Sequence, residues 1–212
     1  MNMARACLFC GAGPLTPVYM QMAQTPDDAE AELLARYAAG DPAAARLLTQ
    51  RLTPRLFAYA CRVLGDRAEA EDATQETMLR LWRIAREWRE GEAKVSTWAY
   101  RVMANLCTDR LRRRREVGLE AAGDPADPAH GAEAALQQSA RLDALQQALG
   151  QLPVRQRQAV VLRHIDGLAN PEIAAILGVG VEAVESLTAR GKRALKAALA
   201  TQKDALGFDD DG

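Results

Sequence analysis

Charged and polar side chains gather at three places along the chain, with spacings that could support recognition chemistry. Asp72, Gln75 and Glu76 recur at intervals of three and four residues, which would place them on neighbouring turns of one helix face. An arginine-rich run occupies residues 110–115, and more cations lie at residues 190–196. Grouped carboxylates suit a basic protein partner, whereas grouped cations suit phosphates.

Little in the sequence would support catalysis. The two histidines, His130 and His164, lie in no HExxH arrangement, and there is no glycine-rich phosphate-binding loop or Ser/His/Asp set. We therefore expect a protein that is not an enzyme and that uses no cofactor and no small-molecule substrate. Cys7 and Cys10 form one CxxC pair without a second pair or a nearby histidine, so the sequence predicts no metal site there.

Composition favours an all-α fold. Aromatic residues make up only 5% of the 212 residues, and Ala, Leu, Glu and Arg dominate, as is usual where helices pack on helices. No apolar run approaches the ~20 residues that a membrane span needs. The four cysteines are too few and too scattered for a disulfide framework. We expect a cytoplasmic protein without membrane insertion. The net charge of −1 argues against non-specific coating of nucleic acid by the whole surface.

Capping residues and glycines mark the expected helices. Asp41 and Asp66 are expected to be N-caps, Pro54 to bend or restart a helix, and Ser96 to cap the helix that carries the arginine run. The expected helices lie at residues 27–40, 42–65, 66–91, 96–115, 134–149, 153–165, 170–178 and 181–199.

A stretch without helical periodicity divides the chain. Between residues 116 and 132 glycines and Asp-Pro dipeptides predict an acidic, flexible linker. The expected organisation is an N-terminal extension, a helical bundle, the linker, a second helical domain and an acidic tail, at residues 1–26, 27–115, 116–132, 133–200 and 201–212. Met1, Met20 and Met22 all remain possible starts.

Residues 170–195 contain a short apolar helix, a glycine turn and a longer basic helix. Asn170 is expected to cap the first helix with Pro171 at its first position, Ala174 to allow a close crossing, and Gly178 to form the turn. This pattern is typical of a helix-turn-helix, whose second helix enters the DNA major groove. The side chains expected to face the DNA are Glu182, Glu185, Ser186, Ala189, Arg190, Lys192, Arg193 and Lys196.

The helix expected at residues 96–115 combines aromatic side chains, the amide of Asn105 and the arginine run. Bases lifted from melted duplex need stacking surfaces and amide donors beside a cationic track, so this helix suits single-stranded nucleic acid. Part of the positive charge also complements the helix dipole. Trp82 and Trp98 are expected first of all to anchor the hydrophobic core.

Three segments in the same order resemble the extracytoplasmic-function (ECF) sigma factors of the sigma-70 superfamily. Residues 70–82 (AEDATQETMLRLW) resemble the part of their region two that binds the coiled coil of the largest polymerase subunit. Residues 96–110 (STWAYRVMANLCTDR) are similar to the segment that melts and reads the minus-ten element. Residues 152–168 and 172–195 resemble region four, which reads the minus-thirty-five element.

The resemblance implies a sigma factor that binds core RNA polymerase and directs promoter-specific transcription initiation in a stress response, under an anti-sigma factor. It implies a region 2 bundle and a region 4 helix-turn-helix. Asp72, Gln75 and Glu76 would bind polymerase. The implied minus-ten contacts, together with the loop at residues 89–96, are Trp98, Asn105, Arg110, Arg112 and Arg113. The implied minus-thirty-five contacts are Glu185, Ser186, Ala189, Arg190 and Arg193.

The expected recognition helix departs from the family pattern. Many members carry basic residues where Glu185 and Leu187 stand, and a larger side chain where Ala189 stands. A carboxylate repels phosphate but can accept a hydrogen bond from cytosine N4, so an altered base preference is expected. Gly180 replaces a common proline, which should loosen the turn slightly.

A different class of DNA-binding protein also fits part of this pattern. A dimeric helix-turn-helix regulator would bind a palindrome tightly without polymerase and would need a dimerisation surface. In such a protein the exposed set of Asp72, Gln75 and Glu76 would have no role.

Overall fold

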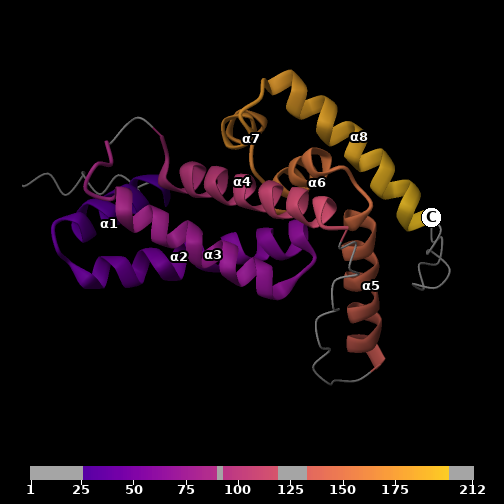
Figure 1. Cartoon of the computed structure of the whole chain (residues 1–212), viewed down its shortest axis with the longest axis horizontal. Helices are drawn as coiled ribbons and strands as arrows, with labels where there is room; N and C mark the ends of the chain where they lie inside the picture. Colours follow the sequence, from indigo (N-terminus) through magenta and orange to yellow (C-terminus); the bar gives the residue numbers. More distant parts are fainter. Residues whose placement is uncertain (1–25, 90–92, 119–132, 201–212) are drawn as a thin grey trace, which may run out of the picture.

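The computed structural model describes residues 26–89, 93–118 and 133–200, and helices account for most of these residues (Figure 1). No strand occurs within the described ranges, which confirms the all-α prediction. In chain order the elements are α1 (Pro26–Ala38), α2 (Pro42–Leu64), α3 (Arg67–Ile84), α4 (Val95–Glu116), α5 (Glu133–Gly150), α6 (Val154–Val160), the π-helix η1 (Val161–Ile165), α7 (Asn170–Leu177) and α8 (Val181–Ala200).

Helices α1 to α4 form a first lobe around one apolar centre. Leu48, Leu52 and Leu56 recur every fourth residue on α2 and are fully buried. The two predicted aspartate caps are confirmed. Asp41 accepts a hydrogen bond from the N–H of Ala43 at 2.9 Å, and Asp66 accepts one from Glu69 at 2.9 Å.

The prediction that a helix restarts near Pro54 is wrong, because α2 continues through that residue. The predicted bend there stays a prediction. Proline lacks the N–H of one helical hydrogen bond and crowds the preceding turn. Here the ring is exposed, while Leu52 and Leu56 on either side of it are fully buried. Burial of these leucines against the other helices outweighs the local penalty.

The predicted ends around the loop before α4 also need correction. Helix α3 ends at Ile84 rather than at Gly91, and α4 begins at Val95, with Lys94 rather than Ser96 as its N-cap. The reason is tertiary packing. Val95 is fully buried, and Trp88 of the connection packs edge-on against Trp98, with ring centroids 6.2 Å apart.

Helices α5 to α8, with η1, form a second lobe. The helix expected at residues 153–165 is α6 followed by a π-helical turn, closed by the bond from the N–H of Asp166 to the carbonyl of Val161 at 3.0 Å. Gly178 adopts a φ of 65° between α7 and α8, as the predicted turn requires. Helix α8 crosses α6 closely at buried Gly191, where an added Cβ would lie 2.5 Å from Val160.

The start of α7 differs from the expectation by one position. Ala169 is the N-cap, so Asn170 and Pro171 occupy the first two helical positions. The carboxylate of Glu172, in the first turn, accepts a hydrogen bond from the N–H of Ala169 at 3.0 Å and so satisfies the N-cap backbone. The Asn170 side chain is thereby available to contact α8.

The two lobes pack against each other. Helix α4 lies between the layer of α1, α2 and α3 and the helices α6 and α7, while α5 runs crosswise at the end of α2 (Figure 1). Contacts join α4 to α7, α4 to α6 and α2 to α5. The helix that carries the arginine run is therefore shared between both lobes.

Some sequence predictions concern residues outside the described ranges. These include the N-terminal extension with Cys7 and Cys10, His130, most of the linker and the acidic tail. Within the described ranges no helix is both long and apolar enough to cross a membrane. The same residues contain no group of three or more His, Cys, Asp and Glu side chains placed to hold a metal ion.

Candidate nucleic-acid interface

Helix α3 displays the predicted acidic set on its outer face. Asp72 and Gln75 are exposed, and the side chain of Glu76 is half-exposed. Arg80, one turn later, donates to the Glu76 carboxylate at 2.7 Å, and this bond lowers the pKa of Glu76 below its usual range. Glu76 is therefore an anion at neutral pH, with part of its hydrogen-bonding capacity already used.

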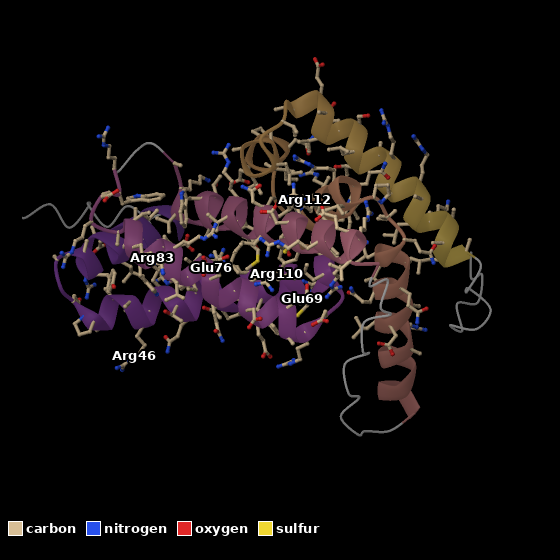
Figure 2. The ribbon with its side chains drawn as sticks, in the orientation of Figure 1. Arg46, Glu69, Glu76, Arg83, Arg110 and Arg112 are labelled. Carbon is tan, nitrogen blue, oxygen red and sulfur yellow. The ribbon has the colours of Figure 1, made fainter. Side chains whose placement is uncertain are left out.

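A groove of about 420 Å³ runs between α3 and α4 beside this acidic set. Charges of both signs line each side, with Asp72, Glu76 and Arg80 on α3 and Asp109, Arg110 and Arg113 on α4. Figure 2 labels Glu76 of α3 and Arg110 of α4. Arg110 Nη1 lies 4.0 Å from Asp72 Oδ2. The arrangement therefore joins residues predicted to bind polymerase to residues predicted to bind DNA.

The groove also holds an apolar side chain that sequence reasoning missed. Leu79 is 50% exposed among the charged residues of the groove. A signal was present, because Leu79 lies between Met78 and Leu81 on α3 but outside their buried stripe. An exposed leucine beside carboxylates suits a partner helix that carries both apolar and basic residues.

The arginine run divides into exposed and structural members. Arg112 and Arg113 are exposed, and Arg110 is half-buried. Arg114 instead lies 2.8 Å from Glu69 and 3.1 Å from Asp66, and it donates to the carbonyl of Leu64 at 3.1 Å. Arg114 therefore ties α4 to the start of α3.

Trp98, Asn105 and Arg112 are seven residues apart, so they share one face of α4. Trp98 is half-buried against Trp88, in agreement with an anchoring role, whereas Asn105 is exposed. Asn105 borders a hollow of about 340 Å³ whose other walls include Arg155 and Leu177 of the second lobe. Asn105, which is predicted to contact the minus-ten strand, therefore lies beside the second lobe.

Helix α8 presents most of the predicted duplex contacts to solvent. Glu185, Ala189, Arg190 and Arg193 are exposed, and Ser186 is half-buried. The opposite side packs inward through Val184, which is fully buried. The N–H₂ group of Asn170, at the start of α7, lies 3.4 Å from the Glu185 carboxylate.

Two buried polar side chains were missed by sequence reasoning. Arg157 is only 6% exposed and donates to backbone carbonyls of Val63, Gly150 and Leu152. Gln158 is 1% exposed and donates to the carbonyl of Ala104 at 2.9 Å. The sequence does not mark either residue as special, because both belong to the polar stretch at residues 155–158. Their role depends on carbonyls that only the tertiary structure places beside them.

Family models match both lobes. The model for Sigma-70 region 2 matches residues 48–117, and the model for Sigma-70, region 4 matches residues 142–195. ECF RNA polymerase sigma factor SigE of Mycolicibacterium smegmatis is 36% identical over 157 residues, covering 72% of this chain and 60% of SigE. ECF RNA polymerase sigma factor SigM of Mycobacterium tuberculosis is 37% identical over 169 residues, covering 78% of this chain and 82% of SigM.

A solved structure shows the same fold. CnrH of Cupriavidus metallidurans, solved in complex with the cytosolic domain of CnrY, aligns with a TM-score of 0.62 and 28% identity. The alignment covers 82% of this chain and 99% of CnrH. The two lobes, their order and their helices thus have counterparts in proteins of known family.

Proposed function

Because the chain belongs to the ECF sigma factors of the sigma-70 family, we propose that it binds core RNA polymerase and directs transcription initiation to specific promoters. The observation that carries this proposal is the order of the two matched regions, together with an exposed acidic face on α3 and exposed cations on α4 and α8. Sigma factors act by binding, so we assign no covalent chemistry to the chain. The proposed functional units are residues 27–115 and 133–200.

Core polymerase docks on α3 through Asp72, Gln75 and Glu76. These side chains are accessible on neighbouring turns and present negative charge beside exposed Leu79. A basic and partly apolar helix of polymerase is the complementary surface. Leu79 supplies the desolvated contact, and the carboxylates set orientation and register.

The melted minus-ten strand lies along α4. Asn105 offers an amide that can donate to and accept from a base edge, and Trp98 supports this face from its packed position. Arg110, Arg112 and Arg113 lie near the C-terminal end of the same helix and follow the phosphates. The family resemblance also assigns residues 89–96 to handling of the flipped base.

Helix α8 reads the minus-thirty-five duplex. Glu185, Ser186 and Ala189 face base edges, while Arg190 and Arg193 contact phosphates. The bond from Asn170 holds the Glu185 carboxylate, which can accept from cytosine N4. We propose that this pair gives the protein a minus-thirty-five preference distinct from that of members with a basic residue at this position.

An anti-sigma factor is the proposed regulator, in a stress response in the cytoplasm. The support comes from the similarity to CnrH, which was solved bound to the cytosolic domain of CnrY. A partner of this kind would act by covering the polymerase-binding or DNA-binding surfaces named above.

A footprinting experiment separates this proposal from an independent DNA-binding regulator. Promoter fragments are probed with nuclease for duplex protection and with permanganate for strand opening, using the chain alone, core polymerase alone and both together. We expect protection near minus thirty-five and opening near minus ten only with both, because tethering on polymerase supplies the effective concentration. Tight protection of a palindrome by the chain alone would support the regulator instead.

A further inference from the structure

The π-helical turn η1 carries two basic side chains to which the proposed function gives no role. Arg163 and His164 are both exposed, and both belong to the five residues of this turn. π-Helical turns are rare and often occur at functional sites. Because η1 comes directly before the helix-turn-helix in the chain, we asked whether its basic side chains adjoin the DNA-binding surface.

The packing of α6 against α8 brings Lys192 to these side chains. Gly191 is buried where the two helices cross, and a Cβ added there would lie 2.5 Å from Val160. Lys192 is the next residue of α8 and is exposed, while His164 lies one turn after Val160. Partial burial lowers the pKa of His164, and the positive charges of Lys192 and Arg163 lower it further. Arg163, His164 and Lys192 therefore form one group, the η1 cluster.

The η1 cluster is not neutralised by carboxylates. Within the described ranges no carboxylate forms an ion pair with any of its three members. Arg163 instead donates to the backbone carbonyl of Leu168 at 2.9 Å, a bond that uses one of its five N–H donors. Like charges held close together repel each other, so an anion bound among them is favoured.

The η1 cluster borders the surface proposed to read the minus-thirty-five duplex. Four residues recur every three or four positions and so share one strip of α8: Glu185, Ala189, Lys192 and Lys196. The bond from Arg163 reaches Leu168, two residues before Asn170, whose amide lies 3.4 Å from the Glu185 carboxylate. When a recognition helix enters the major groove, the phosphate backbone lies at the edges of its base-reading surface. The cluster stands at such an edge.

We propose that η1 is a second DNA-binding element of this protein: Arg163, His164 and Lys192 hold a backbone phosphate beside the minus-thirty-five element, and His164 takes up a proton from solvent as the phosphate binds. The contact reads no base, but it adds affinity that decreases as salt concentration rises. The proposal rests on the proposed function, because it takes α8 to enter the major groove of this duplex.

Proton uptake follows from the charges around the imidazole. Helices α2 and α7 also pack against η1, but the charged groups that act on His164 are Lys192 of α8 and Arg163 of η1 itself. Both are cations, so the free protein favours the neutral imidazole. A bound phosphate favours the imidazolium instead. Binding therefore strengthens as the pH falls from 8 to 6, and the proton is released when the DNA dissociates.

Three variants of the full chain, each assembled with core polymerase, test the cluster. Lys192→Ala and Arg163→Ala each remove one cation, and only the second also loses the bond to Leu168. His164→Gln keeps a hydrogen-bonding side chain that does not titrate. Arg46→Ala is the matched control, because Arg46 is an exposed cation near the start of α2, remote from α8 (Figure 2). Circular dichroism verifies the helix content of each variant.

Fluorescence anisotropy measures the affinity of each holoenzyme for a promoter duplex over a salt series, at pH 8 and at pH 6. We expect Lys192→Ala and Arg163→Ala each to weaken binding about fivefold and to reduce the slope of log affinity against log salt concentration by about 0.9. The wild type should gain about threefold to tenfold more affinity than His164→Gln between pH 8 and pH 6. Arg46→Ala should match the wild type throughout.

Ethylation of single phosphates locates the contact. Ethylation beside the minus-thirty-five element should interfere with binding of the wild type and Arg46→Ala, but not with binding of Arg163→Ala. Unchanged affinity and salt slope for both Lys192→Ala and Arg163→Ala, with intact helix content, would overturn the phosphate contact. Equal pH dependence of the wild type and His164→Gln would overturn proton uptake.

Two further outcomes separate this proposal from its alternatives. Loss of affinity for core polymerase in these variants, without a change in the salt slope of DNA binding, would assign the η1 cluster to an acidic protein surface and overturn the proposal. A wild-type holoenzyme that binds promoter duplex no more tightly than core polymerase alone would instead reject the proposed function.

Discussion

The guanidinium of Arg110 lies 4.0 Å from the carboxylate of Asp72, across the groove between α4 and α3. The relationship joins the helix proposed to hold the melted strand to the helix proposed to dock on polymerase. Asp72 remains largely exposed despite this contact, with 70% of its side chain accessible. A basic partner can therefore reach Asp72 and compete with Arg110 for it, which would release the guanidinium toward phosphate.

Replacing Asp72 or Glu76 by alanine should weaken binding to core polymerase by on the order of tenfold, because each change removes a charge at a complementary surface. Helix content should be unchanged, since neither side chain is buried. Calorimetric titration of the purified chain into core polymerase measures the effect. Glu71→Ala on the same helix is the control, and equal core affinity for all three variants would refute the assignment of this surface.

Glu185→Arg should change which minus-thirty-five sequences are selected, rather than raise affinity for all of them. The carboxylate is exposed in the proposed groove and is held by Asn170 at 3.4 Å. An arginine there would favour guanine over cytosine on the contacted strand. Selection from a randomised promoter library with holoenzyme measures the preference. A uniform gain across the library would mean that Glu185 affects only phosphate attraction.

Alanine substitutions at Arg114 and at its neighbour Arg113 should change the free energy of unfolding by different amounts. Arg114→Ala breaks contacts to Glu69, Asp66 and the Leu64 carbonyl, and it should lower the free energy of unfolding by about 1–3 kcal/mol. Arg113→Ala removes an exposed side chain and should change it by less than about 0.5 kcal/mol. Urea denaturation followed by circular dichroism makes the comparison. Equal effects would contradict the structural role of Arg114.

Asp166, which directly follows η1, should make its interaction with Tyr100 of α4 sensitive to pH. Burial raises the pKa of Asp166 from 3.8 to about 6, against the opposing influence of Arg62, Tyr100 and Arg55. A raised pKa means that the folded state favours the protonated form, so this stabilisation is present below about pH 4 and is lost as pH rises through about 6.

The melting temperature of the wild type should therefore fall relative to that of Asp166→Asn as the pH rises from 4 to 7. Above pH 7 the difference between the two melting temperatures should stay constant. Asparagine keeps an oxygen for the hydrogen bond from Tyr100 but cannot ionise. Differential scanning fluorimetry across this range tests the point. Parallel curves over the whole range would show that Asp166 does not titrate in it.

Local features of this fold were predictable from the sequence, whereas contacts between the lobes were not. Asp41, Asp66 and Gly178 act through hydrogen bonds or backbone angles within a few residues, so their types reveal their roles. The end of α3 was misplaced because packing of Trp88 against Trp98, rather than a glycine, sets where the chain leaves the helix.

The same distinction applies to the candidate site. The exposed polar residues of α3 and α8 recur with helical periodicity, so it was predictable from the sequence that each set would share one face of its helix. The roles of Gln158 and Arg157 were not predictable, because their partners at Ala104 and Val63 are 54 and 94 residues away in the chain. Exposed Leu79 was not predicted, because in the sequence only its position outside the buried stripe of α3 distinguishes it from the core leucines of the first lobe.

The most direct test of the central claim is run-off transcription on genomic fragments with core RNA polymerase, with and without the purified chain. We predict discrete transcripts that require the chain and that are weakened by Asp72→Ala. No dependence of any transcript on the chain, while the chain alone protects DNA in a footprint, would contradict the claim that it is a promoter-directing subunit.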